Sequence, residues 1–267
     1  MMRRTLLFAT VALTAMAGWG PAAGAQKPKR VVVVDAGHGG PKSGMRARLP
    51  NGAIVDEKTI TLGVALKLQE ELKKRAVTVV MTRTTDVDVG LNERGRLANA
   101  ANGNLFLSIH VNAAGPKQPK LARGLEVYFF DEAKTEDERR VEAMENETVF
   151  FETDSAVRAG DPLNLIMRDM AQNEHLRESS ELALIIQDNV SAVHPGPNRG
   201  VKQANFAVLR TAFMPAVLIE TGFGSNPTEA QWLASSGGQR TLAIQIADAT
   251  IEYLDRYEQR VRSTSKR

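Results

Sequence analysis

Apolar runs and helical patterns alternate through the first half of the chain. Val31 to Val34 form an uninterrupted apolar run, which predicts a strand that is buried on both faces. Residues 59–75 carry apolar side chains at helical spacing, and the order then repeats with a strand at 77–82, a helix at 91–101 and a strand at 105–109. This alternation predicts a doubly wound α/β domain with a mostly parallel sheet.

The second half of the chain adds further strands and two long helices. Leu125 to Phe130 is predicted to be a strand, and residues 163–190 and 239–259 follow helical patterns. Two short apolar runs, Phe206 to Leu209 and Ala216 to Ile219, are also predicted as strands. Together these segments predict a mixed, mostly parallel sheet with helices on both of its faces.

An acidic segment interrupts this pattern. Residues 131–154 contain ten acidic side chains and three basic ones. We interpret residues 131–175 as a helical insertion within a single domain that spans residues 31–259, and a solvated acidic loop is the alternative. A short basic linker at 26–30 precedes the domain, and we expect the basic tail at 260–267 to be frayed.

The N-terminal segment has the layout of a signal peptide. Arg3 and Arg4 precede an apolar run from Leu6 to about Ala17, and small residues follow at Ala23-Gly24-Ala25. This layout predicts a signal peptide over residues 1–25. A membrane anchor is the alternative, but the apolar run is shorter than the ~20 residues that span a bilayer. The paired arginines leave both the general secretory and the twin-arginine export routes open.

Composition limits the chemistry that is available. The chain has no cysteine, which excludes disulfides, thiolate ligands and a cysteine nucleophile, so a metal site must use histidine and carboxylates. The formal net charge is +3. Loss of Arg3 and Arg4 with the signal peptide reduces the net charge to about +1, which gives no support to nucleic-acid binding.

Polar residues at the ends of the predicted strands are the candidates for chemistry. His38, His110 and Glu220 each follow an apolar strand run, and Glu57 opens the first helix. Because ligands of open α/β sheets lie outside the carboxyl ends of the strands, we expect these side chains to meet in one crevice. Two imidazoles and two carboxylates suit zinc, which takes three N or O protein ligands in catalytic sites and keeps one position for water.

Each candidate also has a structural interpretation. The glycine-rich turn around His38 is also typical of phosphate binding, but Pro41 stands where a P-loop requires glycine. A single histidine such as His110 is more often a hydrogen-bonded core residue. Glu57 would complement the positive end of its helix equally well. Glu220, at the end of a buried strand, requires a partner to offset desolvation.

The other two histidines show no sign of a functional role, and the common serine-esterase motif is absent. His175 lies in a polar helical stretch and His194 precedes a proline, so both are expected to be structural or exposed. No G-x-S-x-G motif is present, which disfavours a serine esterase.

Several motifs, in order, resemble those of the zinc-dependent N-acetylmuramoyl-L-alanine amidases, the family that includes the bacterial cell-division amidases. They cover most of residues 31–260 and read VVVVDAGHGG, EKTITLGVALKLQEEL, VVMTRTTDVDVGLNERGRLAN, LFLSIHVNA, RGVKQANFAVLR and PAVLIETGFGSNPTEAQWL. The chain departs from the family pattern after DAGHGG, where Pro41 to Met45 replace an acidic residue and a Gly-Ala pair. It also has Gly224 where a bulky apolar residue is common.

The resemblance implies a set of roles for these residues. His38, Glu57 and His110 would bind Zn²⁺, and Glu220 would be the catalytic glutamate. Zinc would activate water and polarise the lactyl-amide carbonyl, while Glu220 would carry the proton to the amine of L-alanine. The substrate would be peptidoglycan, and the products a stem peptide and a glycan strand. The family also implies an enzyme exported to the periplasm of a Gram-negative bacterium, without stable membrane insertion.

The insertion resembles the regulatory insertion of the division amidases, in which a helix blocks the zinc until an activator protein displaces it. We therefore expect one carboxylate among Glu142, Glu145 and Glu147 to fill the open position of the zinc, and the Glu145-Asn146 pair favours Glu145. Deletion of residues 132–160 should then raise activity on purified cell wall.

Two other functions remain open at this stage. One is a different zinc peptidase that acts on wall peptides, which product analysis would distinguish from the amidase. The other is a non-catalytic peptidoglycan-binding protein of the division machinery, which would have no need of all four of His38, Glu57, His110 and Glu220.

Overall fold

The computed structural model describes residues 29–115, 121–147 and 162–264, with only the backbone described for 162–173. The expected signal peptide at 1–25 lies outside the described residues. In the described part of the chain, no helix is both long and apolar enough to cross a membrane.

A six-stranded mixed sheet forms the centre of the molecule, in the order β4-β1-β5-β8-β6-β7. β1, β4, β5 and β8 run parallel to one another, β6 is antiparallel to β8, and β7 is parallel to β6. The strands are β1 (Val31–Ala36), β4 (Thr78–Met81), β5 (Leu105–Asn112), β6 (Leu125–Phe130), β7 (Asn198–Ala204) and β8 (Ala216–Phe223).

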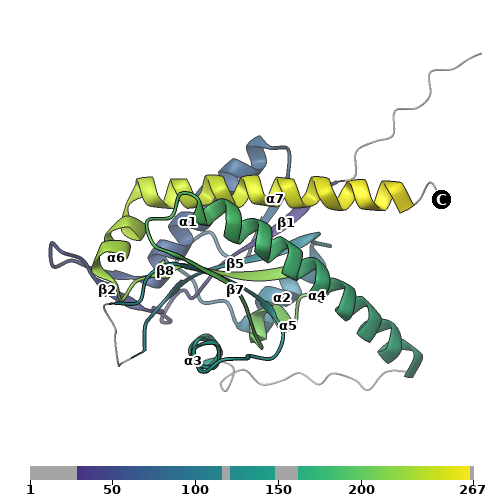
Figure 1. The fold of residues 1–267 in the computed structure, drawn as a ribbon, viewed down its shortest axis with the longest axis horizontal. Helices are drawn as coiled ribbons and strands as arrows, with labels where there is room; N and C mark the ends of the chain where they lie inside the picture. The colour runs from purple at the N-terminus through teal and green to yellow at the C-terminus, as the bar shows by residue number, and fades with distance from the viewer. Residues whose placement is uncertain (1–28, 116–120, 148–161, 265–267) are drawn as a thin grey trace, which may run out of the picture.

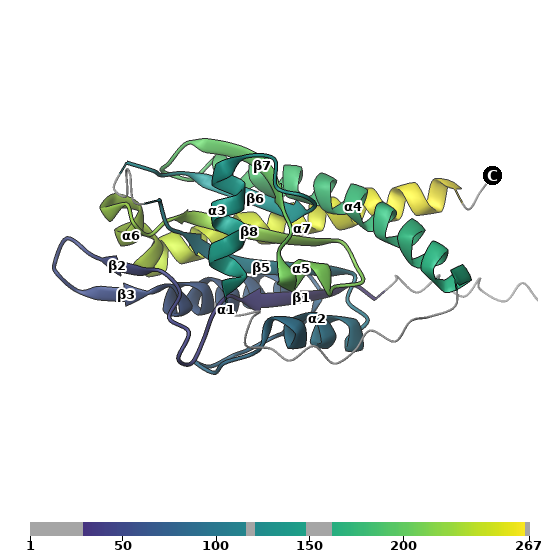
Figure 2. The same cartoon turned by 90° about the horizontal axis from the view of Figure 1, so that it is seen from below.

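Helices cover both faces of the sheet (Figures 1 and 2). One face carries α1 (Glu57–Lys74), α4 (Pro162–Ser191) and α7 (Ser236–Thr264). The other face carries α2 (Leu91–Ala100), α3 (Glu136–Glu145) and α5 (Ala207–Arg210). α6 (Pro227–Ala234) and the hairpin of β2 (Arg46–Arg48) and β3 (Ile54–Asp56) complete the fold. The predicted single α/β domain is thereby confirmed.

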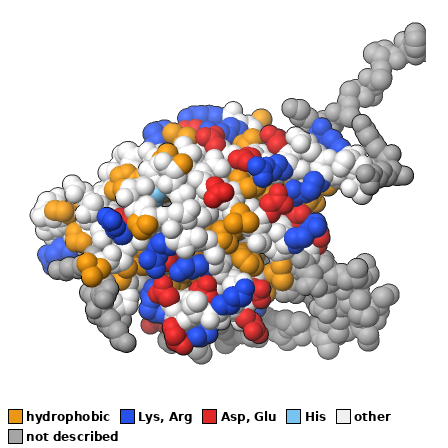
Figure 3. Space-filling view, viewed as in Figure 1, with side chains coloured by type: hydrophobic (Ala, Val, Ile, Leu, Met, Phe, Trp, Pro, Cys, Tyr) orange, Lys and Arg blue, Asp and Glu red, His pale blue; other side chains and the backbone are white. Residues whose placement is uncertain are grey.

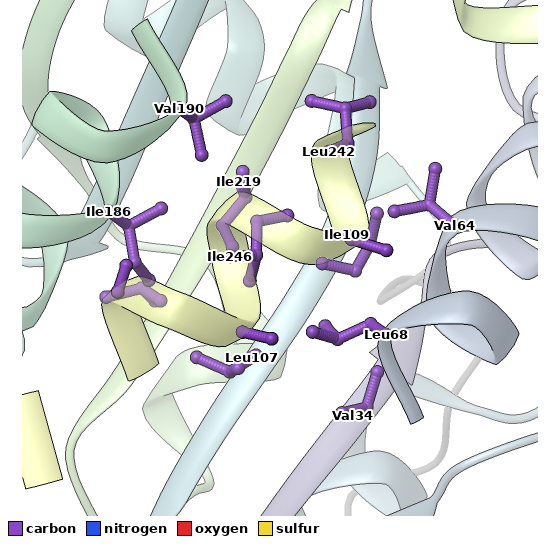
Figure 4. Close-up of a cluster of buried hydrophobic side chains, with 14 of the residues drawn as sticks. Val34, Val64, Leu68, Leu107, Ile109, Ile186, Val190, Ile219, Leu242 and Ile246 are labelled. Carbon is purple, nitrogen blue, oxygen red and sulfur yellow. The ribbon is translucent and has the colours of Figure 1, made fainter. Parts of the chain in front are cut away.

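The larger core lies between the sheet and the long helices. Alternate residues of the strands point to this face because side chains alternate along a strand, and they meet apolar residues of α1, α4 and α7 (Figure 4). The labelled side chains are Val34, Leu107, Ile109 and Ile219 from the sheet and Val64, Leu68, Ile186, Val190, Leu242 and Ile246 from the helices.

The opposite face is apolar at one end and polar at the other. Phe106, Tyr128 and Leu218 belong to a second, smaller buried cluster under α2 and α5. Further along the same strands, the side chains on this face become Ser108, His110 and Glu220, which are all buried. This polar end of the face is where α3 lies (Figure 2).

Most predicted elements are found close to their expected positions, with two errors. The tail that was expected to be frayed from residue 260 is helical as far as Thr264, and Arg260 pairs with Glu178 and Glu181 of α4. Phe206 to Leu209 is not a strand, because Ala207–Arg210 forms the short helix α5. The apolar side chains of this run are buried in the smaller cluster, which a helical turn permits as readily as a strand does. The strand β7 and the β2–β3 hairpin were not predicted, because their sequences are short or polar.

Candidate metal centre

A sharp turn after β1 presents His38. His38 has φ of 57°, and Gly39 and Gly40 have φ of 135° and 57°. A left-handed conformation is unusual for a residue other than glycine and requires support from its surroundings. A Cβ at Gly37 would lie 2.6 Å from the His110 ring. Glycine at position 37 is therefore what lets the two imidazoles approach each other.

Two buried arginines hold this turn in place. Arg94 donates to Asp35 Oδ1 at 2.7 Å, to the Ala36 carbonyl at 2.7 Å and to the His38 carbonyl at 2.9 Å. Arg83 donates to the carbonyls of Ala36 and Gly37 at 2.9 and 2.8 Å. Since both guanidinium groups are buried, the turn is fixed by charged hydrogen bonds that exclude water.

The same turn does not hold a phosphate. The Gly40 N–H donates to Asp86 Oδ1 at 2.8 Å, and Lys58 donates to Asp86 and to the Gly40 carbonyl. A carboxylate of the chain itself thus occupies the turn, which contradicts the phosphate-binding alternative.

Glu57 stands at the first position of α1 and is oriented by backbone donors. The Val111 N–H donates to Glu57 Oε1 and the Met45 N–H to Glu57 Oε2, both at 2.8 Å. Such hydrogen bonds fix the direction of a carboxylate that serves as a ligand.

His38, Glu57, His110 and Glu145 converge on one point. One ligand atom from each lies within 4.8 Å of the others. His38 Nε2 lies 3.2 Å from Glu57 Oε1 and 3.3 Å from Glu145 Oε2. His110 Nδ1 lies 3.2 Å and 2.8 Å from the same two oxygens. Zinc bound at ~2.1 Å in a tetrahedron separates its ligand atoms by about 3.4 Å, so the four atoms have the spacing of a zinc coordination shell.

The hydrogen bonding of these atoms also fits a metal. Among the buried atoms of the described residues, His38 Nε2, His110 Nδ1 and both Glu145 oxygens have no hydrogen-bond partner. Buried polar atoms without partners are costly, and atoms that face one another without hydrogen-bond geometry are typical of ligands around an ion. The residues present therefore fit a divalent cation.

The imidazoles and carboxylates of the cluster balance one another's charge, and a metal ion could take the place of the protons on the imidazoles. Burial lowers the pKa of His38, but the charges of Glu57 and Glu145 outweigh burial and raise the pKa to about 9. The pKa of His110 is raised for the same reasons, and that of Glu145 is lowered mainly by the two imidazoles, against the effect of burial. The two carboxylates thus favour protonated imidazoles, and one divalent cation would supply the same charge to neutral imidazoles.

Glu145 reaches the cluster from α3, inside the acidic insertion. α3 begins with a capping box between Thr135 and Glu138, and Glu145 is its last residue. Beyond the helix, Asn146 donates to the Asn205 carbonyl and accepts from the Ala207 N–H, both at 2.8 Å. These bonds anchor the end of the helix that carries Glu145.

The other two carboxylates considered for this position lie elsewhere. Glu142 accepts from the Asn205 N–H at 3.0 Å, and Glu147 is exposed. Of the three, only Glu145 belongs to the cluster.

Glu220 lies beside the cluster and outside it. It pairs in register with His110 across β5 and β8, it is fully buried, and neither of its oxygens has a hydrogen-bond partner. Burial raises the pKa of Glu220, and the charge of Glu145 raises it further. The site therefore contains a buried carboxyl group without a hydrogen-bond partner beside the cluster, and its raised pKa favours the protonated form.

The remaining histidines do not join the site. His194 is buried, and its ring bonds the backbone of Gly196 and Thr221, which is a structural role. His175 lies on α4 and is partly exposed. Sequence reasoning missed Asp35, Arg94 and Arg83, because buried arginines have no distinctive pattern and these residues support the site without belonging to it.

Comparisons with known proteins agree on one family. A family profile described as N-acetylmuramoyl-L-alanine amidase matches residues 32–252. The chain is 30% identical over 241 residues to "N-acetylmuramoyl-L-alanine amidase AmiA" of Escherichia coli, covering 90% of this chain and 81% of that protein. It is 32% identical over 239 residues to "N-acetylmuramoyl-L-alanine amidase AmiC" of Neisseria meningitidis, covering 88% of this chain and 55% of that protein.

Solved amidase structures share the fold of this chain. An N-acetylmuramoyl-L-alanine amidase from Clostridium difficile 630 aligns with a TM-score of 0.63 and 28% identity, over 85% of this chain and 97% of that chain. The catalytic domain of CwlV, an amidase from Bacillus (Paenibacillus) polymyxa, aligns with a TM-score of 0.61 and 29% identity, over 85% and 98% of the two chains.

Replacement of His110 should strongly weaken metal binding. We expect His110→Ala to lower the affinity for Zn²⁺ by more than about 100-fold, because a direct ligand is lost. The measurement is zinc content after dialysis against a graded chelator, with His175→Ala as the matched control. Full retention of zinc by a folded His110→Ala protein would contradict the assignment.

Replacement of Arg94 should destabilise the turn that carries His38. Arg94→Met leaves Asp35 buried without its cation, which is expected to cost about 3–5 kcal/mol in urea unfolding. Arg96→Met is the control, because Arg96 is exposed and pairs with the exposed Glu93. The double variant Asp35→Asn, Arg94→Met should lose less than the sum of the single changes. Additive losses would show that the pair is not coupled.

Proposed function

The chain belongs to the N-acetylmuramoyl-L-alanine amidase family, and from this premise we propose that it hydrolyses the amide bond between N-acetylmuramic acid and L-alanine in peptidoglycan with a bound zinc ion. The observation that carries the proposal is the convergence of His38, Glu57 and His110 on one point with Glu220 beside it. A zinc ion held by the first three residues would supply acidification of water and polarisation of the amide carbonyl.

The residues of the chain have separate tasks in this reaction. His38, Glu57 and His110 would hold the cation, and the backbone donors on Glu57 fix the direction of its carboxylate. Glu220, in its carboxylate form, takes the proton of the attacking water and passes it to the nitrogen of L-alanine as the amide bond breaks. The buried surroundings of Glu220 favour its protonated form, which suits the second of these transfers.

We further propose that α3 inhibits the enzyme. Glu145 Oε2 lies 2.8 Å from His110 Nδ1 and 3.3 Å from His38 Nε2, where it would take the fourth ligand position and exclude water or substrate. Displacement of α3 by an activator protein of the division machinery would open this position. The resemblance of the insertion to that of the division amidases supports this regulation and a role in daughter-cell separation.

We place the enzyme outside the cytoplasmic membrane, in the periplasm of a Gram-negative bacterium. The signal-peptide pattern at 1–25 supports export, and the proposed substrate is a wall polymer that lies outside the cytoplasm. The similarity to AmiA of Escherichia coli and AmiC of Neisseria meningitidis is consistent with this location.

Glu220→Gln should separate metal binding from catalysis. The amide keeps the shape of the side chain but cannot accept the proton, so we expect kcat to fall by at least about 100-fold with zinc content unchanged. Products of cell-wall digestion are separated by mass, and the amidase releases intact stem peptides. Glu132→Gln, at an exposed position, is the control. Equal digestion by the variant and the wild type would refute the role of Glu220, and cleavage within the stem peptide would indicate a peptidase.

Glu145→Ala should activate the isolated enzyme. Loss of the fourth ligand frees the position for water, and we expect the basal rate on purified cell wall to rise by about tenfold or more. Glu136→Ala is the matched control, because Glu136 lies on the same helix with a side chain that is 92% exposed. Deletion of residues 132–160 should act in the same direction as Glu145→Ala. An unchanged or lower rate in folded Glu145→Ala protein would argue against inhibition by α3.

A further inference from the structure

A row of charged residues continues from the metal centre across the sheet. His110 of β5 pairs with Glu220 of β8, and Glu220 pairs with Glu126 of β6. Glu126 in turn lies opposite Arg199 of β7 at an irregularity in the register. Neighbouring strands are ~4.8 Å apart, so Arg199 stands three strands, or about 14 Å, from His110 along one face.

A β-bulge brings two cations to this face. Leu125 pairs with Asn198 but Val127 pairs with Val201, so β7 has one residue more than β6 between these pairs. In a regular strand, residues 199 and 202 would point to opposite faces, and the extra residue brings them to the same one. Arg199 Nε and Lys202 Nζ accordingly both bond Glu126 Oε1, at 2.5 and 2.8 Å.

Both carboxylate oxygens of Glu126 accept hydrogen bonds, and its single negative charge balances only one of the two cations. Its side chain is completely buried, and its second oxygen accepts from Asn112 Nδ2 at 2.8 Å and from the Tyr128 hydroxyl at 2.9 Å. One carboxylate beside two cations leaves a local charge of one positive unit. The cations are rigidly placed, because a buried anion holds both of them.

The second anion comes from α3. Asp137 Oδ2 lies 3.3 Å from Arg199 and 3.5 Å from Lys202, and Arg140 donates to Asp137 Oδ1 at 3.0 Å. Partial burial would raise the pKa of Asp137, but Arg140, Lys202 and Arg199 together lower it, so the side chain is ionised. Acidic and basic side chains are accordingly interspersed on the surface over α3 (Figure 3).

α3 therefore places two carboxylates over the row, Glu145 at the metal centre and Asp137 at the cation pair. The two residues are eight positions apart, which is about 12 Å along a helix. An extended peptide covers this distance with three to four residues. A wall peptide whose first amide lies at the metal would bring a carboxylate of one of its later residues to the place of Asp137.

We propose that Arg199 and Lys202 form a carboxylate-binding subsite for the peptide part of the substrate, and that Asp137 occupies this subsite while α3 covers the centre. This inference rests on the proposed function. It makes α3 a mimic of the substrate at two points. The group that the subsite would bind is a free carboxylate on a residue beyond the L-alanine of the substrate. Its distance from the scissile amide would match the distance between Asp137 and Glu145.

A purely structural role for the cation pair makes a different prediction. If Arg199 and Lys202 only anchor α3, their loss weakens the docking of α3 and changes the cleavage of all substrates to the same extent. If they bind substrate, their loss matters after α3 has left and only for substrates that bear the carboxylate. The test therefore uses the enzyme with the two changes Glu145→Ala and Asp137→Asn, which remove the carboxylates that α3 places at the metal centre and at the cation pair.

The experiment compares two soluble N-acetylmuramoyl-peptides of the same sequence. One has free carboxylates on the residues beyond L-alanine, and in the other these groups are carboxamides. In this doubly changed enzyme, Lys202→Met should raise KM for the carboxylate substrate by at least about tenfold with kcat little changed, because a charged hydrogen bond is lost. It should leave KM for the carboxamide unchanged. Lys202 is the position of choice, because Arg199 remains to balance Glu126.

Two further variants complete the design. Lys202→Arg should restore most of the preference for the carboxylate, and Lys134→Met, at an exposed lysine near α3, should alter neither substrate. If Lys202→Met does not fold, Asp137→Asn in the otherwise wild-type protein replaces it. Its expected effect is tighter binding of the released carboxylate peptide, measured by calorimetry, with no gain for the carboxamide.

The outcomes separate this proposal from the function on which it rests. Equal KM changes for the two substrates, or none, overturn the subsite while the amidase function stands. Failure of the doubly changed enzyme to cleave either substrate at the muramoyl amide overturns the proposed function and the substrate subsite together.

Discussion

Three carboxylates buried next to one another are the constraint on which this structure depends. Glu57, Glu145 and Glu220 are removed from water at the ends of β5 and β8, and the low-dielectric surroundings make three adjacent negative charges prohibitively costly. The two imidazoles offset this cost, and a divalent cation would offset it with less disturbance of their neutral form. The remaining features, from the Gly37 turn to the docking of α3, serve to hold these groups at one point.

The supporting network shows how the fold meets this requirement. The turn after β1 has an unfavourable backbone conformation at His38, and buried bonds from Arg94 and Arg83 stabilise it. Asp35, which neutralises Arg94, accepts hydrogen bonds from Thr82, the residue after β4, and from Ser108 of β5. The position of His38 is therefore coupled to β1, to β5 and to the end of β4.

The sequence predicted the strands that carry His110 and Glu220 better than the elements around them. Runs such as Leu105 to Ile109 carry strong strand signals, so the placement of His110 and of Glu220 at the end of the sheet followed from the alternation of elements. Phe206 to Leu209 was misassigned because a four-residue apolar run has no period that separates a strand from a helical turn. β7 was missed because RGVKQA is half polar at the edge of the sheet. Glu145 was selected by resemblance alone, since no local pattern distinguishes it from Glu142.

Under the proposed inhibition by α3, the tether between this helix and the rest of the chain determines how the closed state responds to concentration. α3 packs with few apolar side chains, chiefly Val141 and Met144, and polar contacts hold both of its ends. The intrinsic affinity of α3 for the site is therefore modest. A segment of the same chain nevertheless acts at an effective concentration that is set by linker length and is commonly millimolar. Dilution of the enzyme into a large compartment does not lower this value. A single isolated molecule would stay as firmly closed as a crowded population, until a partner competes for the helix itself.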